Sequence, residues 1–240
     1  MEGFHPFKKS EKFFVVLTAL FCVSLALTNV VSAKLFQVPF FSSIPLMTGD
    51  LTYPVTFLVT DIISEVWGMR RARFVILLGF FTNLFMFLVI QVALKATPHE
   101  YWWNISNSFG YATVRDYQVA YESVFSTTFH MVFSSMMAYL ISQSLDIRTF
   151  HFLKKLTKGR HLWLRNNMST ITSQFVDSAV FSFLFWYIGL GLSFSQCVQI
   201  GMYSYLFKGL CALLDTPFCY MGVSLARKYF GNEKKIEAVT

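Results

Sequence analysis

The stretch that decides the fold is YPVTFLVTDIISEVWG, residues 53–68. It is apolar enough to lie in a lipid bilayer, yet it contains Asp61 and Glu65, and Pro54 stands near its start. A carboxylate at the centre of a membrane is unfavourable by roughly 3 kcal/mol on insertion scales, so such groups face a protein interior or a water-filled cavity. The stretch therefore predicts a membrane helix that lines a functional cavity.

The composition agrees with an integral membrane protein. Of the 240 residues, 55% are hydrophobic and only 14% are charged, whereas about 25% of the residues in a typical soluble domain are charged. The net charge of +7 suggests nucleic acid at first, but the basic residues fall between apolar runs, where they act as topology signals. The four cysteines show no CxxC spacing, so we predict neither a zinc site nor a disulfide framework.

Six apolar segments predict an all-α integral membrane protein with six transmembrane helices in a single domain, residues 1–240. The expected spans are residues 13–33, 51–67, 74–94, 119–142, 169–190 and 199–222. The first segment has a signal peptide as its alternative, because lysines precede it and VSA at 31–33 resembles a cleavage site. The second and fifth spans both carry central polar residues and run in opposite directions, which suggests two inverted three-helix repeats.

The loop at residues 34–50 is apolar and contains two prolines. We expect it either to re-enter the membrane or to lie at the membrane interface.

The distribution of basic residues predicts the orientation. If the N-terminus is cytoplasmic, sixteen of the twenty lysine and arginine residues lie in cytoplasmic segments and only Lys34, Lys95 and Arg115 lie outside. Lys208 alone falls within a predicted span. Because basic loops stay in the cytoplasm, both termini are expected there.

Ionisable side chains gather at one depth. At about 1.5 Å of rise per residue, Asp61, His130, Asp177 and Lys208 all lie near the middle of their predicted spans. Polar stripes at helical spacing accompany them: Thr56, Thr60, Asp61, Ser64 and Glu65; Asn167, Thr170, Gln174 and Asp177; Thr127, His130 and Ser134; Lys208 and Asp215. Four stripes at one depth predict a wet cavity inside a helical bundle.

Each of these features also has a structural interpretation. One alternative is that an aspartate only neutralises Lys208 in a buried pair that fixes helix packing. Glu65 lies beside the basic cluster at residues 70–73, where a surface ion pair is equally consistent, and a hydrogen-bonded packing role is the alternative for His130. Serine and threonine stripes often join helices without binding a ligand.

Four blocks carry a resemblance to a known family. They are TNVVSAKLF at 28–36, YPVTFLVTDIISEVWGMRRAR at 53–73, RNNMSTITSQFVDSAVF at 165–181 and LFKGLCALLDTPFCY at 206–220. With these blocks the chain resembles the queuosine-precursor transporters, also called vitamin-uptake-type transporters. It departs from the family pattern at Ser173, where glycine is usual, at Asn166, where threonine is usual, and at Trp67, where tyrosine and glycine are usual.

The resemblance implies an importer of 7-deazaguanine bases for the queuosine modification of transfer RNA. The family substrates are 7-cyano-7-deazaguanine, 7-aminomethyl-7-deazaguanine and queuine. A carboxylate suits the N1–H and 2-amino donors of such a base, and cationic or amide donors suit its O6 and N7. A second carboxylate suits a cationic aminomethyl group. The expected substrate-binding residues are Asp61, Asp177, Lys208, Gln174, Asn29 and Lys34; those expected in coupling or gating are His130, Glu65 and Asp215.

We therefore predict a multi-pass importer of the bacterial inner membrane that works by alternating access around a midplane site. It needs no metal and no cofactor, and its partners are the nucleobase and the lipid bilayer, not nucleic acid. The main alternative is a substrate-capture subunit that requires a separate ATPase module. A membrane enzyme is the other alternative, but the chain has no HExxH and no GxSxG motif. The preferred base, the coupling ion and the copy number, including a homodimer, are left open.

Overall fold

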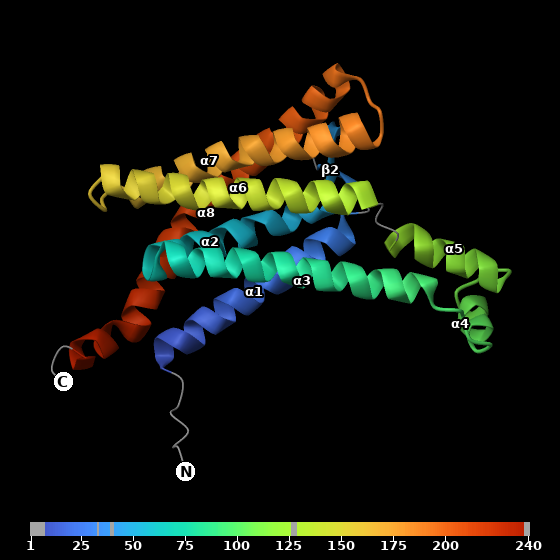
Figure 1. The fold of residues 1–240 in the computed structure, drawn as a ribbon, viewed down its shortest axis with the longest axis horizontal. Coiled ribbons are helices and arrows are strands. Elements are labelled where there is room, and N and C mark those ends of the chain that lie inside the picture. Colours follow the sequence, from blue (N-terminus) through green and yellow to red (C-terminus); the bar gives the residue numbers. More distant parts are fainter. Residues whose placement is uncertain (1–7, 33, 39–40, 126–128, 238–240) are drawn as a thin grey trace, which may run out of the picture.

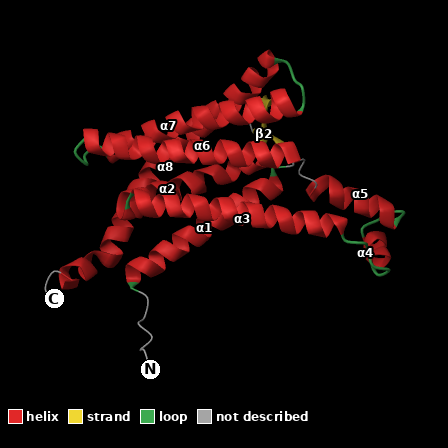
Figure 2. Ribbon diagram, viewed as in Figure 1, coloured by secondary structure: helices red, strands yellow, loops and turns green. Residues whose placement is uncertain are grey.

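The structure, a computed structural model, describes residues 8–32, 34–38, 41–125 and 129–237. Figure 2 shows that helices make up nearly all of it. The elements in chain order are α1 (Lys9–Val31), β1 (Leu35–Val38), β2 (Phe41–Met47), the 3-10 helix η1 (Thr48–Thr52), α2 (Tyr53–Trp67), α3 (Met69–Lys95), α4 (Trp102–Ser108), α5 (Val114–Phe125), α6 (Phe129–Leu156), α7 (Leu162–Phe181), the π-helix η2 (Ser182–Gly189) and α8 (Phe194–Glu237). The predicted helical fold is confirmed, and the antiparallel hairpin of β1 and β2 is the exception within the described ranges.

Local backbone chemistry sets the helix boundaries that matter for the site. Pro54 lies in the first turn of α2, where its missing N–H has no helical partner to lose. Gly68 ends α2 with φ 85° and immediately starts α3, because glycine adopts this left-handed conformation without steric penalty. A second left-handed turn at Gly159 (φ 78°) reverses the chain between α6 and α7.

The long helices form a bundle, from which α4 and α5 project at one end (Figure 1). Helix α6 lies along α7, α7 packs against α8, and α2 packs against α1, α3 and α8. The start of α1, the end of α8 and the α2–α3 and α6–α7 turns all lie at the opposite end of the bundle (Figure 1). These are the segments that the basic residues assign to one side of the membrane.

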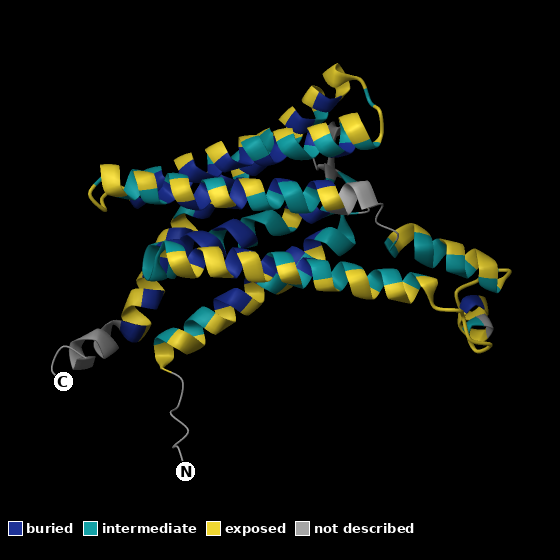
Figure 3. Ribbon diagram, in the orientation of Figure 1, coloured by how far each residue is buried: buried dark blue, intermediate teal, exposed yellow. Residues whose placement is uncertain are grey.

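Burial separates the central helix from the outer ones, as the colouring of Figure 3 shows. Eight of the 15 residues of α2 are buried, from Thr56 to Ser64. In contrast, large apolar side chains on the outer helices are exposed, for example Phe85 at 69% and Val92 at 72%. Exposed apolar surface on this scale is typical of a protein that faces lipid rather than water.

Four of the described helical segments are long and apolar enough to cross a membrane: α1, α3, α7 with η2, and α8. Helix α2 has only 15 residues, and α6 carries many polar residues on its inner side. The fourth predicted span, residues 119–142, covers parts of two helices, α5 and α6. Six spans and two inverted repeats stay predictions.

The apolar loop 34–50 contains the hairpin of β1 and β2, followed by the start of η1. Residues 39 and 40 within it lie outside the described ranges. The loop leads directly into α2, so it places Asp50 and Tyr53 at the entrance of the central helix.

Candidate functional site

A buried ion pair joins α7 to α8. The Lys208 Nζ donates to Asp177 Oδ2 at 2.7 Å, and the Ser142 Oγ of α6 donates to the other carboxylate oxygen at 3.0 Å. The Lys208 and Asp177 side chains are only 6% and 7% exposed. The structure therefore brings two of the predicted substrate-binding residues into direct contact, in an interior where a charge needs a partner.

The lysine of this pair is also surrounded by residues from the N-terminal half. Its ammonium lies 4.0 Å from the centre of the Tyr53 ring, a cation–π contact with the first residue of α2. Asp50 of η1 is buried nearby and acts on the same ammonium. Burial raises the pKa of the Asp50 carboxyl above its usual value, although the Lys208 charge acts in the opposite direction.

One small cavity, here named the Gln174 cavity, adjoins the pair. Its lining includes Asn29, Ser142, Gln143, Gln174 and Asp177. The Oε1 atoms of Gln143 and Gln174 are buried and have no hydrogen-bond partner. The cavity volume of about 20 Å³ is close to what a single water needs. In this conformation the pocket is closed, but it presents two amide oxygens that can accept hydrogen bonds.

A larger cavity of about 130 Å³, here named the Asp50 cavity, lies against the same lysine. Asp50 and Lys208 supply its charged groups, and Phe181 and Trp186 supply aromatic surface. The Ser178 Oγ in its lining is buried without a hydrogen-bond partner. The Asp177–Lys208 pair thus stands between two cavities, since Asp177 borders the first and Lys208 borders the second.

Asn29 connects three helices around the Gln174 cavity. Its Nδ2 donates to Asn83 Oδ1 of α3 at 2.6 Å, and its Oδ1 accepts a bond from the Ser135 Oγ of α6 at 3.3 Å. Asn83 is a polar residue of the interior that the sequence analysis missed. The signal was present, because a lone asparagine in an apolar span is expected to face a partner.

Asp61 lies in a different polar cluster from the Asp177–Lys208 pair. It is 2% exposed, and no hydrogen bond or ion pair among the described residues reaches it. The charges that act on it belong to Asp146 and Asp215. Asp146 in turn accepts a hydrogen bond from the Ser173 Oγ at 3.1 Å, one of the positions where the chain departs from the family pattern. No group of three ligands in the described ranges is arranged to hold a metal ion.

The sequence analysis missed Asp146 because the predicted span ended at residue 142. In the structure α6 continues to Leu156, so Ser142 and Asp146 lie one turn apart on its inner side, and both are buried. Their four-residue spacing is a polar stripe of the kind recognised in the other helices.

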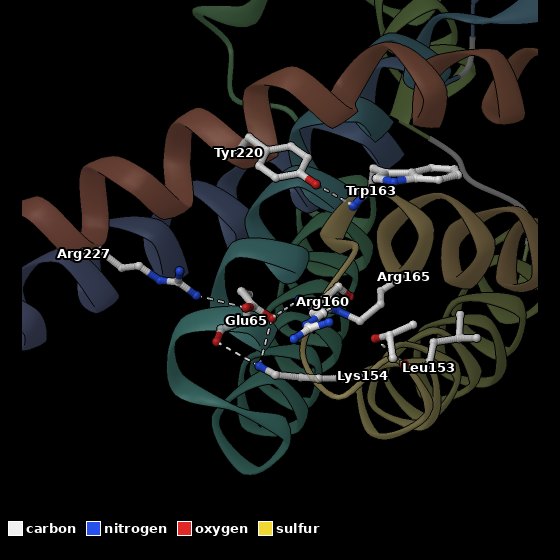
Figure 4. Close-up of polar contacts among 9 residues, drawn as sticks. Glu65, Leu153, Lys154, Arg160, Trp163, Arg165, Tyr220 and Arg227 are labelled. Atoms are coloured by element: carbon white, nitrogen blue, oxygen red, sulfur yellow. Dashed lines mark hydrogen bonds and ion pairs between the residues drawn. The ribbon is translucent and has the colours of Figure 1, made fainter.

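Glu65 forms a third cluster that joins four helices (Figure 4). Its Oε2 accepts bonds from Lys154 Nζ and Arg165 Nη2, both at 2.8 Å, and its Oε1 accepts a bond from Arg227 Nη2 at 3.0 Å. The Arg165 side chain is completely buried, and its guanidinium lies 5.5 Å from the centre of the Phe150 ring. A surface pair with the basic cluster at residues 70–73 was one expectation, but the observed partners come from α6, α7 and α8.

Three further site residues were expected from the sequence, namely Lys34, His130 and Asp215. Lys34 is exposed, and its carbonyl oxygen accepts bonds from the N–H (2.9 Å) and Oγ1 (2.7 Å) of Thr48 at the base of the hairpin. The side chain of His130 lies outside the described residues. Asp215 is buried on α8, and its Oδ2 has no hydrogen-bond partner.

Comparisons with known proteins indicate the family of this chain. A family profile described as "Putative vitamin uptake transporter" matches residues 47–222, which include Asp61, Glu65 and the Asp177–Lys208 pair. The "Probable queuosine precursor transporter" of Bacillus subtilis (strain 168) is 28% identical over 78% of this chain and 74% of that protein. The "Queuosine precursor transporter" of Escherichia coli (strain K12) is 24% identical over 80% of this chain and 79% of that protein.

A third relative, the "Probable queuosine precursor transporter" of Haemophilus influenzae, is 26% identical over 67% of this chain and 60% of that protein. No solved structure matches. All three relatives are named as transporters rather than enzymes, in agreement with the prediction. The profile match covers well over half of the chain, and the resemblance predicted from its four blocks is confirmed: the chain belongs to the vitamin-uptake-type family of membrane transporters.

Proposed function

We propose that this protein takes up queuosine precursors across the bacterial inner membrane by alternating access around the Asp177–Lys208 pair. The names of the three relatives support the substrate class. The observation that carries the choice of site is the buried pair itself, which stands between two cavities and joins α7 to α8. Intramembrane charges at such positions generally serve a substrate or ion pathway.

The chemistry of the pair suits a 7-deazaguanine. The Asp177 carboxylate accepts hydrogen bonds from N1–H and the 2-amino group, while the Lys208 ammonium donates to O6. The unpartnered oxygens of Gln143 and Gln174 accept further donors of the base. Because the Gln174 cavity has room for about one water, the base binds there only after the surrounding helices separate.

The Glu65 cluster is the proposed cytoplasmic gate. It holds α2, α6, α7 and α8 together near the α2–α3 and α6–α7 turns. With both termini in the cytoplasm, as the basic residues indicate, this end of the bundle faces the cytoplasm. In this proposal the gate is closed toward the cytoplasm, and it opens when Lys154, Arg165 and Arg227 separate from the Glu65 carboxylate.

Asp61, Asp146 and Asp215 are the candidates for ion coupling. No ion pair among the described residues involves these three buried carboxylates. Three anions so placed are unfavourable, and we suggest proton binding as the simplest way to neutralise them. Facilitated diffusion followed by metabolic trapping needs no such proton. Uptake by wild-type protein in liposomes, measured with and without an imposed pH gradient, distinguishes proton-coupled transport from facilitated diffusion.

The function is tested with the purified chain in liposomes. Labelled 7-cyano-7-deazaguanine, 7-aminomethyl-7-deazaguanine and queuine are offered without ATP or any other protein, and we expect at least one base to accumulate. Asp177→Asn and Lys208→Ala are expected to abolish uptake. Their matched controls Asp116→Asn and Lys155→Ala, at exposed positions on α5 and α6, are expected to transport normally.

Two results would contradict the proposal. Normal uptake by both Asp177→Asn and Lys208→Ala would show that the pair is not the substrate-binding site. Tight binding of a base by wild-type protein without transport would favour the ATP-driven capture subunit instead.

A further inference from the structure

The Asp50 cavity is a formed site of which the function above uses only Lys208. Its two charged residues are almost fully buried, Asp50 at 6% and Lys208 at 5% exposure. Its volume of about 130 Å³ is several times the roughly 10–15 Å³ that one water needs. The Ser178 Oγ provides a buried hydroxyl with no partner. Buried polar groups are normally satisfied, so these features together indicate a ligand.

The charges of this cavity do not balance. Lys208 is bonded to Asp177, and no ion pair among the described residues involves Asp50. Asp177 adds a second negative charge near Asp50. The group that completes this arrangement is therefore a cation, since a buried carboxylate is stabilised by a counter-charge held close to it.

The cavity wall favours a planar ligand next to that cation. Phe181 and Trp186 border the cavity, and the Phe185 ring lies beside both, 5.3 Å from the first ring and 4.7 Å from the second. Aromatic surfaces of this kind bind heteroaromatic rings by stacking or edge contacts.

We propose that the Asp50 cavity receives the positively charged substituent of the transported base, and that Asp50 is a specificity-determining residue. This inference rests on the proposed function. A base held at the Asp177–Lys208 pair directs its substituent into the cavity that Lys208 also borders. A primary ammonium on that substituent donates to the Asp50 carboxylate, whereas a nitrile offers no donor. The protein is then selective for 7-aminomethyl-7-deazaguanine over 7-cyano-7-deazaguanine.

The test compares the two bases in wild-type protein and in Asp50→Asn, which removes the charge but keeps the size. We expect uptake of the aminomethyl base to fall by about tenfold or more, in line with the loss of a charge-assisted hydrogen bond. Uptake of the cyano base should change by less than about twofold. The exposed-site variant Asp116→Asn should leave the ratio of the two uptake rates unchanged.

An equal decrease for both bases, or no change for either, would overturn the inference. If Asp50→Asn cannot be recovered folded, the inference is tested with wild-type protein, by measuring how well unlabelled compounds compete with uptake of the labelled aminomethyl base. The 7-hydroxymethyl analogue replaces the ammonium by a neutral hydroxyl and should compete about tenfold less well than the unlabelled aminomethyl base, so equal competition would also overturn the inference. If no base is taken up at all, the proposed function fails; if both are taken up without a charge preference, only this inference fails.

Discussion

Removing both charges of the Asp177–Lys208 pair separates its contribution to stability from its contribution to transport. Lys208→Ala alone leaves the Asp177 carboxylate buried with Ser142 as its remaining hydrogen-bond donor. Asp177→Asn alone leaves the ammonium buried without its ion-pair partner, with the Tyr53 ring and the Asp50 carboxyl as its remaining neighbours. The double variant, Asp177→Asn with Lys208→Ala, removes both charges of the pair together.

The expected magnitudes follow from burial. Because both side chains are less than one-tenth exposed, each single variant should lose about 3–5 kcal/mol of unfolding free energy. For a chain of this size, about 1 kcal/mol corresponds to roughly 2–4 °C in the unfolding midpoint, so the singles should unfold on the order of 6–20 °C below the wild type. The double variant should regain most of this loss, since replacing a buried pair by neutral groups is often close to neutral.

Thermal unfolding of the detergent-purified proteins, combined with uptake in liposomes, measures both quantities. If the pair binds the base, the double variant recovers stability but not uptake. A double variant that transports normally would show that the pair only fixes the packing of α7 against α8, and the reasoning on the binding site would be refuted.

Two further predictions concern the packing around the site. Glu65→Gln should lower the unfolding midpoint far more than Arg227→Gln does. The reason is that the Arg227 side chain is 64% exposed, and an exposed ion pair contributes only about 0–1 kcal/mol. Equal shifts of the midpoint in the two variants would contradict the burial argument. Gly201→Ala places a Cβ atom 2.6 Å from the Ser182 Oγ and should destabilise the protein by about 1–3 kcal/mol in the same unfolding assay. The added Cβ of Gly209→Ala meets nothing within 4 Å, so this control variant should keep the wild-type unfolding midpoint.

Helical periodicity predicted the inward faces well. The polar stripe of α2 from Thr56 to Ser64 is buried, as are Gln174 and Asp177 on α7 and Lys208 on α8. These positions follow from a repeat of 3.6 residues within one helix, so they can be read from the sequence. The contact between Asp177 and Lys208 agrees with their common depth.

Relations between helices were harder to predict. The sequence analysis grouped Asp61 with the Asp177–Lys208 pair, whereas its charged neighbours are Asp146 and Asp215. Depth along a span does not define which helices are neighbours, and a hydropathy window averages the lipid-facing and interior sides of a helix. For that reason α6, with its polar interior side, was placed too early in the chain, and Asp146 was lost with it.

The shortness of α2 has a consequence for biogenesis. Its 15 residues rise about 22 Å, less than the roughly 30 Å of hydrocarbon, and the central acid Asp61 adds about 2.5–3.5 kcal/mol against insertion. The segment is therefore a poor substrate for the translocon on its own. In the finished protein α8 supports it closely, because Gly222 leaves room for Ile62. Since α8 is synthesised last, α2 should settle into the membrane only after the ribosome has released the C-terminal helix, and a nascent chain truncated before Phe194 should leave it accessible to proteases.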